Sequence, residues 1–336
     1  MRKRFLIIRL SSIGDVLLTT PFVRALRKKF PDSQIDYLIK SEYVELIENN
    51  PHINNKFKFE ANNGLGEILN WRFQIKSNNY DAIFDFHRNI RTLMMTKFNG
   101  GTNSGKYNKR YFKRFMMVKF GINLYDQITP VSERYLEVGS NYNLVNDGLG
   151  LDLFTNINSP LHQLVKPTSQ VKIVIAPGAG FQTKRWPSGY FAQLADLLIN
   201  KFDVKIILIG SNEDLSISEE IKAQMKGAVI DAIGTGSILD TTEIIKNSHA
   251  LISNDSGLMH IAVSQKIPVL AIFGSTTEEL GFFPYSDQYK VLEVHDLKCR
   301  PCSHIGRNKC PKKHFKCMIE ITPDKALKAI TELIEL

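Results

Sequence analysis

The chain contains no apolar run close to the roughly 18 residues that a membrane-spanning helix requires, so we expect no transmembrane segment. It also lacks the loop G-x-x-x-x-G-K-[ST], which excludes a P-loop nucleotide-binding enzyme. Residues 1–4 resemble the charged start of a signal peptide, but Arg9 and Asp15 interrupt the apolar stretch that should follow. Together these absences predict a cytoplasmic protein.

Cysteine is scarce, and its four copies are confined to the pattern Cys299-x2-Cys302-x7-Cys310-x6-Cys317. A Cys-x-x-Cys pair with two further thiols supplies the donors of a tetrahedral zinc site, although the spacing fits no standard zinc module. Disulfides are not expected in a reducing cytoplasm. Structural zinc and reduced structural thiols both remain open. No pair of acidic residues in the pattern acid-x-acid follows a predicted strand, so we expect no essential catalytic metal.

Two segments, residues 97–125 and 298–316, contain no acidic residue. The cations of the first segment are Lys97, Lys106, Lys109, Arg110, Lys113, Arg114 and Lys119, and they are interleaved with Tyr107, Tyr111, Phe112, Phe115, Met116 and Met117. No nucleic-acid-binding module accompanies the net charge of +9, so no nucleic-acid partner is expected. An anionic membrane surface, a phosphorylated substrate and a solvated helix with a few buried aromatic residues remain open.

The length of 336 residues suits two domains of about 150 residues. Apolar runs alternate with longer amphipathic segments, which predicts parallel α/β sheets. The predicted strands are residues 5–10, 35–39 and 82–86, then, after a polar linker at 156–170, residues 171–176, 204–209, 229–231, 250–253 and 269–273. We expect an N-terminal domain over 1–160, a C-terminal domain over 171–321 and a closing amphipathic helix over 322–336.

Asp15 lies where the first predicted strand gives way to an amphipathic segment that ends in basic residues. Ligands of open α/β sheets collect where the carboxyl ends of strands meet the N-termini of helices. Asp15 is therefore a candidate catalytic carboxylate, and capping of the following helix is the alternative.

Two strand ends of the second half carry small residues and charge. Gly178, Ala179 and Gly180 follow one strand and precede Lys184, an arrangement typical of a diphosphate site. An ordinary glycine turn with a surface lysine is the alternative. Glu213 follows the next strand and suits hydrogen bonding to ribose hydroxyls, although an exposed acid at a helix start is also ordinary.

A third strand end carries the sequence Asp255-Ser256-Gly257-x-x-His260. Gly257 permits close approach to a ligand, and His260 follows Ser256 by about one helical turn, so both should face the same rim. A buried structural histidine is the alternative for His260.

The ordered set of motifs resembles the lipopolysaccharide heptosyltransferase family, glycosyltransferase family 9, from about residue 3 to residue 330. The motifs are Arg9–Asp15 with Pro21, Lys184-x-Trp186-Pro187, Asp255-Ser256-Gly257-x-x-His260 and residues 268–274. The resemblance implies a GT-B fold, with two Rossmann-like doubly wound domains facing a cleft. It also implies transfer of heptose from ADP-L-glycero-D-manno-heptose to the inner core of lipopolysaccharide, with inversion.

The resemblance also implies the role of each site residue. Asp15 becomes the catalytic base and Lys184 stabilises the ADP leaving group. Donor binding falls to Ala179, Gly180, Lys184, Glu213, Asp255, Ser256, Gly257 and His260, and acceptor binding to Arg9, Ser11, Ser12, Arg88, Arg91 and Arg134. For Arg134, a structural ion pair is an equal alternative.

The implied partners are the donor ADP-heptose, an anionic lipid-linked Kdo/heptose acceptor and the surface of the inner membrane. The resemblance further implies a monomer that acts as a peripheral protein at the cytoplasmic face of that membrane and needs no essential cofactor. His87 and Arg88 depart from the family pattern, which puts the acceptor in question. The alternative reading keeps the GT-B fold but uses another nucleotide-sugar donor for a different surface glycan.

Overall fold

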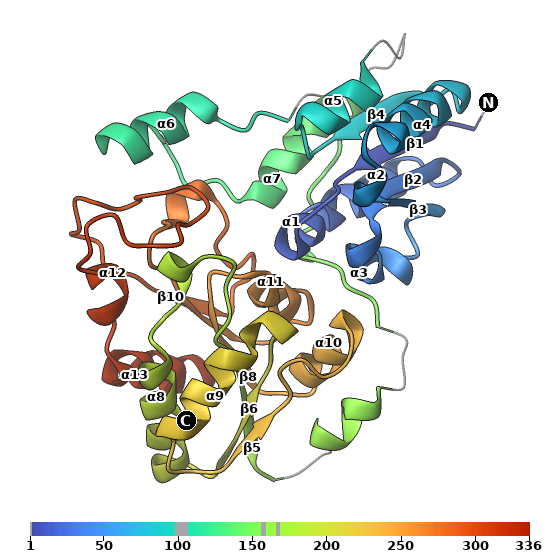
Figure 1. Ribbon diagram of the computed structural model, residues 1–336. Coiled ribbons are helices and arrows are strands. Elements are labelled where there is room, and N and C mark those ends of the chain that lie inside the picture. The colour runs from blue at the N-terminus through green and yellow to red at the C-terminus, as the bar shows by residue number, and fades with distance from the viewer. Residues whose placement is uncertain (1, 98–106, 156–158, 166–168) are drawn as a thin grey trace. The chain divides into compact units, whose positions relative to one another are not determined.

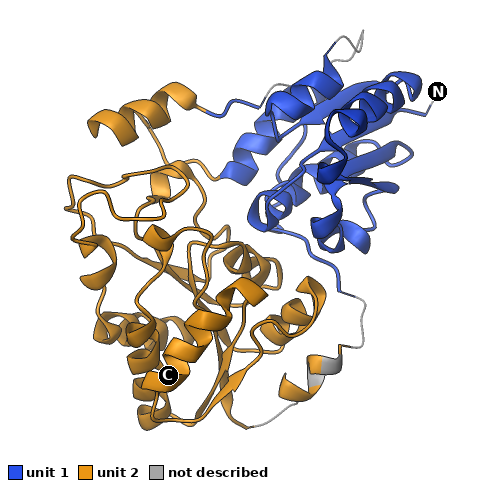
Figure 2. Cartoon of the chain, viewed as in Figure 1, with its two compact units in different colours: residues 1–109, 131–156 blue, residues 110–130, 157–336 orange. Residues whose placement is uncertain are grey.

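The computed structural model describes residues 2–97, 107–155, 159–165 and 169–336. The chain divides into two compact units (Figure 2). Unit 1 contains Met1–Lys109 and Val131–Asn156, and unit 2 contains Arg110–Pro130 and Ile157–Leu336. Residues 110–130 thus group with unit 2 although they precede the expected boundary at 160. Lys106 and parts of the expected linker 156–170 lie outside the described residues.

Unit 1 is built on a four-stranded parallel sheet in the order β3-β2-β1-β4 (Figure 1). Its strands are β1 (Arg4–Ile8), β2 (Gln34–Lys40), β3 (Asn55–Phe59) and β4 (Ala82–Asp85). Nearly every residue of β1 and β2 is buried, as expected of parallel strands covered on both faces. Because the chain reverses direction across the sheet between β1 and β4, their carboxyl ends form a topological switch point.

The helices of unit 1 cover both faces of this sheet. They are α1 (Ile13–Leu17), α2 (Thr20–Lys29), η1 (Ser41–Tyr43), α3 (Glu45–Glu48), η2 (Ala61–Asn63), α4 (Gly64–Ser77), α5 (Ile90–Thr96), α7 (Val131–Leu136) and η3 (Glu137–Tyr142). Where the sequence predicted one amphipathic segment after Asp15, the structure has two helices. Pro21 in the first turn of α2 explains the break, because proline lacks the amide hydrogen that would continue α1.

Unit 2 is built on a six-stranded parallel sheet in the order β10-β9-β8-β5-β6-β7. Its strands are β5 (Val171–Ala176), β6 (Val204–Leu208), β7 (Val229–Asp231), β8 (Ala250–Asn254), β9 (Val269–Ile272) and β10 (Tyr289–Leu292). Counted within the unit, this is the Rossmann order 3-2-1-4-5-6, with the switch point between β5 and β8. Unit 1 has the first four strands of the same order.

The helices of unit 2 are α6 (Tyr111–Phe120), η4 (Pro160–Val165), η5 (Gln182–Lys184), α8 (Ser188–Lys201), η6 (Asn212–Asp214), α9 (Leu215–Gln224), α10 (Ile238–Lys246), α11 (Gly257–Ser264), η7 (Glu278–Leu280), α12 (Lys316–Ile319) and α13 (Pro323–Ile334). Those that pack against its sheet include α8, α11 and α13 (Figure 1). One core joins α8, α9 and α13 to the sheet. The amphipathic C-terminal helix predicted from residue 322 is confirmed: Thr322 caps α13, and Ala326 and Ile330 face the core.

All eight predicted strands are present, with ends that differ by at most two residues. The prediction missed β3 and β10, the two edge strands that carry lysines among their apolar residues. Among the described residues, no helix is both long enough and apolar enough to cross a bilayer.

Candidate active site

In unit 1, the carboxylate of Asp15 lies in the first turn of α1, just beyond the carboxyl end of β1. Its Oδ1 atom is 2.7 Å from Nη2 of Arg9 and accepts a 3.5 Å hydrogen bond from the hydroxyl of Tyr135. The hydroxyl of Ser12 donates to Oδ2 at 3.1 Å. Ser12 is the N-cap residue of α1, so Asp15 is not the helix cap that the sequence left open. The Asp15 carboxylate is thus held by side chains while 19% of the side chain stays exposed.

The guanidinium of Arg9 joins three segments around Asp15. Its Nε atom donates to the carbonyl of Ser11 and its Nη1 atom to the carbonyl of Phe86, both at 2.7 Å. Burial opposes the charge of Arg9, but Asp15 and the neighbouring tyrosines outweigh burial and raise its pKa. Arg9 is therefore a fixed cation that orients Asp15.

The loop after β4 reaches the same switch point. Asp85 accepts backbone hydrogen bonds from His87 and Arg88 at 2.9 and 2.8 Å, which shapes a tight turn. Lys109 donates to the carbonyls of the same two residues at 2.6 and 3.0 Å, and the guanidinium of Arg88 donates to the carbonyl of Tyr107. These bonds tie residues 107–109 to the end of β4.

His87 is a neutral side chain in a cationic environment. Burial lowers its pKa to about 4, and Arg9 and Lys109 act in the same direction. Its Nδ1 atom is buried without a hydrogen-bond partner among the described residues. An uncharged imidazole with an unsatisfied nitrogen is suited to a polar ligand.

The remaining predicted acceptor residues differ in exposure. Ser11 is half-buried, Arg91 is exposed on α5, and Arg134 is buried on α7. The structure thus gathers Arg9, Ser11 and Ser12 around Asp15, and the predicted acceptor contacts of all six residues stay predictions.

In unit 2, Lys184 and Asp255 meet at the switch point between β5 and β8. Nζ of Lys184 lies 2.6 Å from Oδ2 of Asp255, and both side chains are mostly buried. The hydroxyl of Thr276, in the loop after β9, donates to the same oxygen at 2.7 Å. Three segments that follow neighbouring strands therefore converge on one carboxylate.

The position of Lys184 is fixed by Trp186, which is 2% exposed in the core of unit 2. The indole nitrogen donates to the carbonyl of Ile321 at 2.8 Å, and the backbone amide of Trp186 donates to the side chain of Asn254 at 3.0 Å. Asn254 in turn donates to the carbonyl of Pro177 at 2.7 Å. These bonds explain why a buried tryptophan follows the lysine by two positions.

The loop after β5 brings Ala179 and Gly180 to this edge of the sheet. In the described part of the chain, neither backbone amide donates a hydrogen bond to another residue, while Arg185 holds the carbonyl of Ala179 at 2.7 Å. A Cβ atom at Gly180 would meet open space, whereas one at Gly178 would lie 2.3 Å from the carboxylate of Asp214. Gly178 therefore serves internal packing, and the two following amides are available to an anion.

Glu213 is exposed after β6, and the buried acid beside it is Asp214, whose carboxylate accepts bonds from the amide and hydroxyl of Ser211, both at 3.0 Å. The contact of Glu213 with ribose stays a prediction.

Ser256 is the N-cap of α11, and Gly257 is its first helical residue. The N-terminus of α11 consequently lies beside Asp255, where its amides and dipole favour an anion. His260 is 3% exposed one turn further along. This burial fits the structural histidine that the sequence left as the alternative, and the rim position of His260 stays a prediction. Its contact with donor stays a prediction.

Sequence reasoning missed several supporting residues. Tyr135 and Lys109 are far along the chain from Asp15 and β4, and no local pattern connects them. The basic segment 298–316 contains Arg300, whose guanidinium donates to the carbonyls of Gly274 and Thr276 at 2.5 and 2.7 Å and pairs with Glu293 at 2.6 Å. Arg300 thus shapes the loop that presents Thr276 to Asp255.

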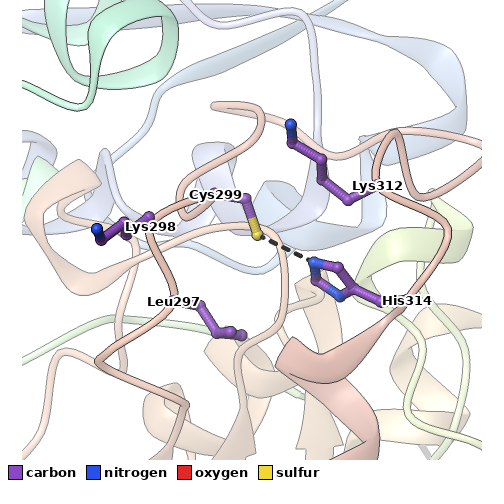
Figure 3. A pocket seen from close by; sticks show the side chains of 5 residues that line it. All are labelled: Leu297, Lys298, Cys299, Lys312 and His314. Atoms are coloured by element: carbon purple, nitrogen blue, oxygen red, sulfur yellow. Dashed lines mark hydrogen bonds between the residues drawn. The ribbon is translucent and has the colours of Figure 1, made fainter.

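The late cysteines are free thiols. Figure 3 shows Cys299 beside His314, with Sγ 3.7 Å from Nε2, in a cavity of about 290 Å³. Burial raises the pKa of Cys302, and that of Cys317 to about 11. Across the described ranges, no three His, Cys, Asp or Glu side chains are placed to hold a metal ion. The residues as placed do not fit tetrahedral zinc, and the zinc site stays a prediction.

The family model described as Glycosyltransferase family 9 (heptosyltransferase) matches residues 69–313. The lipooligosaccharide heptosyltransferase 2 of Haemophilus ducreyi is 25% identical in an alignment covering 98% of this chain and 99% of that protein. The lipopolysaccharide heptosyltransferase 2 of Escherichia coli K12 is 21% identical, with 98% of each chain covered.

Solved structures show the same fold. The glycosyl transferase family 9 protein from Veillonella parvula has a TM-score of 0.80 and 24% identity, covering 99% of this chain and 97% of that one. The ADP-heptose LPS heptosyltransferase II of E. coli has a TM-score of 0.71 and 20% identity, covering 100% and 99%. These likenesses confirm the predicted GT-B fold class of two parallel-sheet α/β domains.

Proposed function

The chain belongs to glycosyltransferase family 9 (heptosyltransferase) and is a glycosyl-transferring enzyme. We propose that it moves heptose from ADP-L-glycero-D-manno-heptose to the inner core of lipopolysaccharide, with inversion at the anomeric carbon. Relatives along nearly the whole chain carry the name lipooligosaccharide or lipopolysaccharide heptosyltransferase, which supports this substrate class. The observation that carries the chemistry is the convergence of Lys184, Asp255 and the N-terminus of α11 at the switch point of unit 2.

Unit 2 binds the donor in this proposal. The amides of Ala179 and Gly180 and the start of α11 receive the diphosphate, and Glu213 faces the ribose. A lysine ammonium has three N–H donors, so Lys184 can keep its bond to Asp255 while it donates to a phosphate oxygen. As the bond between the anomeric carbon and ADP breaks, Lys184 stabilises the charge that develops on the leaving group. Ser256, Gly257 and His260 complete the donor site.

Unit 1 binds the acceptor and supplies the base. The attacking hydroxyl of the acceptor gives its proton to Asp15, its oxygen bonds to the anomeric carbon, and ADP leaves from the opposite face. The transition state resembles the oxocarbenium ion of glycoside hydrolysis. Arg9 and Ser12 orient the carboxylate, as their contacts of 2.7 and 3.1 Å support. Ser11, Arg88, Arg91 and Arg134 contribute to recognition of an anionic Kdo/heptose acceptor.

The proposed reaction needs no cofactor, because Lys184 and helix N-terminal amides supply the stabilising charge. We further place the enzyme, as a monomer, at the cytoplasmic face of the inner membrane, where its lipid-linked acceptor lies. The exposed side chains of Phe112, Phe115 and Lys119 on α6 support contact of segment 106–120 with that surface or with the acceptor.

A donor panel tests the proposal. Purified enzyme is incubated with ADP-heptose and with other ADP-, UDP- and GDP-sugars, each with a deacylated Kdo-containing core acceptor. Selective transfer from ADP-heptose, with the inverted anomeric configuration in the product, is the expected result. Transfer from another donor would overturn the heptose assignment and favour a GT-B enzyme of a different surface glycan.

A further inference from the structure

Helices α4 and α5 of unit 1 pack against each other (Figure 1). Both helices expose large apolar side chains. On α4, Leu65, Leu69 and Phe73 are 66%, 58% and 68% exposed. Their spacing of four residues places them on one stripe of the helix. On α5, Ile90, Leu93 and Met94 are 77%, 48% and 39% exposed and also share a face. We call these six residues the α4–α5 stripe.

The stripe is not the face that these helices use for folding. Ile68 and Ile75 of α4 and Met95 of α5 enter the core of unit 1. The six stripe residues stay 39–77% exposed, and clustered exposure of this kind marks an interaction surface.

The charged residues around the α4–α5 stripe indicate the kind of partner that it fits. Arg72 and Lys76 lie on the stripe side of α4, and Arg91 and Lys97 belong to α5 and its C-cap. The only acid within α4 and α5 is Glu67, which accepts hydrogen bonds from the indole of Trp71 at 2.9 Å and the amide of Glu60 at 3.3 Å. Exposed apolar side chains with a cationic border match the interface of an anionic lipid bilayer.

The stripe also continues from the candidate site. Helix α5 is capped by Asn89, the residue after Arg88, and its first residue is Ile90. In the loop immediately before that cap, the carbonyl of Phe86 accepts a hydrogen bond from Arg9, which holds Asp15. A bilayer at the stripe would therefore adjoin the loop that borders the proposed base.

We propose that the α4–α5 stripe inserts into the headgroup region of an anionic bilayer and presents unit 1 to a lipid-anchored acceptor. This inference rests on the proposed function for its acceptor, while the bilayer contact itself is measured without any sugar transfer.

The test compares two double variants of equal charge change on the same helix. Leu69→Glu/Phe73→Glu alters the stripe, and Asn70→Glu/Gln74→Glu alters exposed positions off the stripe. Each full-length protein is sedimented with vesicles of phosphatidylglycerol and phosphatidylcholine, and with vesicles of phosphatidylcholine alone. Circular dichroism and transfer to a deacylated acceptor control for folding and for the active site.

The wild-type protein should bind the anionic vesicles, and less so at high salt because screening weakens the cationic contribution. The stripe variant should lose about tenfold or more in partitioning, and the off-stripe variant should lose clearly less. Both should transfer to the deacylated acceptor at the wild-type rate. Absence of wild-type binding, or equal loss in both variants, would overturn the inference, as would a wild-type dimer that only the stripe variant dissociates. Absence of transfer with vesicle binding intact would instead contradict the proposed function.

Discussion

The guanidinium of Arg9 and the carboxylate of Asp15 form an ion pair of 2.7 Å at the carboxyl end of β1. The same guanidinium holds the carbonyl of Phe86 beyond β4, so it bridges the two strands that flank the switch point of unit 1. Arg9 is largely buried, so contacts with the protein at the edge of the sheet, and not solvent, determine the position of its side chain. The orientation of Asp15 therefore depends on the pairing of β1 with β4.

Replacement of Arg9 by methionine should lower kcat by about 10²-fold, because a misplaced catalytic group costs about that much. Arg9→Lys keeps the charge but cannot reach both Asp15 and Phe86, so it should restore part of the loss. Steady-state kinetics with the deacylated acceptor measure both variants, and circular dichroism reports their folding. A folded Arg9→Met enzyme with wild-type kcat would show that Asp15 needs no such support.

Replacement of Lys184 by alanine should lower kcat by about 10²–10³-fold, the usual cost of removing one group that stabilises developing negative charge. It should also weaken ADP binding measured by calorimetry, since Lys184 donates to the diphosphate. Lys222→Ala is a matched control, because Lys222 lies on α9 and pairs with Asp231 and Glu219. Equal kinetics for the two variants would remove Lys184 from the mechanism.

His87 makes the folded enzyme sensitive to acid. Its pKa falls from 6.5 to about 4 on folding, because burial and nearby cations oppose its charge. Between pH 6.5 and about pH 4, His87 binds a proton in the unfolded chain but stays neutral in the folded chain. The contribution of neutral His87 to the free energy of unfolding is therefore complete above pH 6.5 and declines as the pH falls to about 4. His87→Gln should therefore lose less thermal stability than the wild type between pH 7 and pH 4.5. Parallel Tm profiles of the two proteins would contradict the buried, neutral imidazole.

Burial raises the pKa of Cys302 and Cys317, so these two cysteines should behave as protonated thiols. With its pKa raised to about 11, Cys317 has about one thiolate in a thousand molecules at pH 8, and it is buried as well. Ellman's reagent should therefore modify it more slowly than the other three thiols, and Cys317→Ser should remove that slow phase. Elemental analysis of the same preparation tests the predicted zinc, and chelation should leave transfer intact. Fast labelling of Cys317, or loss of activity on chelation, would contradict this account.

Strands buried on both faces were predictable because their apolar runs are uninterrupted, as in β1 from Phe5 to Ile8 and in β9. The edge strand β3 has the sequence Asn-Lys-Phe-Lys-Phe, whose lysines belong to a strand with one partner and look like a loop in the sequence. Its pairing with β2 is a tertiary effect that no local pattern contains.

The candidate site divides in the same way. Asp15, Lys184 and Asp255 each lie in the segment that follows a predicted strand, so their position at the carboxyl edge of a sheet could be anticipated from the rule for open sheets. Tyr135 and Arg300 belong to segments that were not predicted as strands, so their contacts with Asp15 and with the carbonyl of Thr276 could not be predicted. No pattern in the sequence indicated the hydrogen bond from Thr276 to Asp255. Spacing along a helix does not say which face packs inward, so it could not decide between the rim position and the buried alternative for His260.

The most direct measurement of the central claim is the turnover of Asp15→Asn with ADP-heptose and a deacylated Kdo-containing acceptor. The amide has nearly the shape of the carboxylate but does not take the acceptor proton. We predict a fall in kcat of about 10²–10⁴-fold, with calorimetric ADP affinity and thermal unfolding close to wild type. A folded Asp15→Asn enzyme that turns over at nearly the wild-type rate would contradict the assignment of Asp15 as the base.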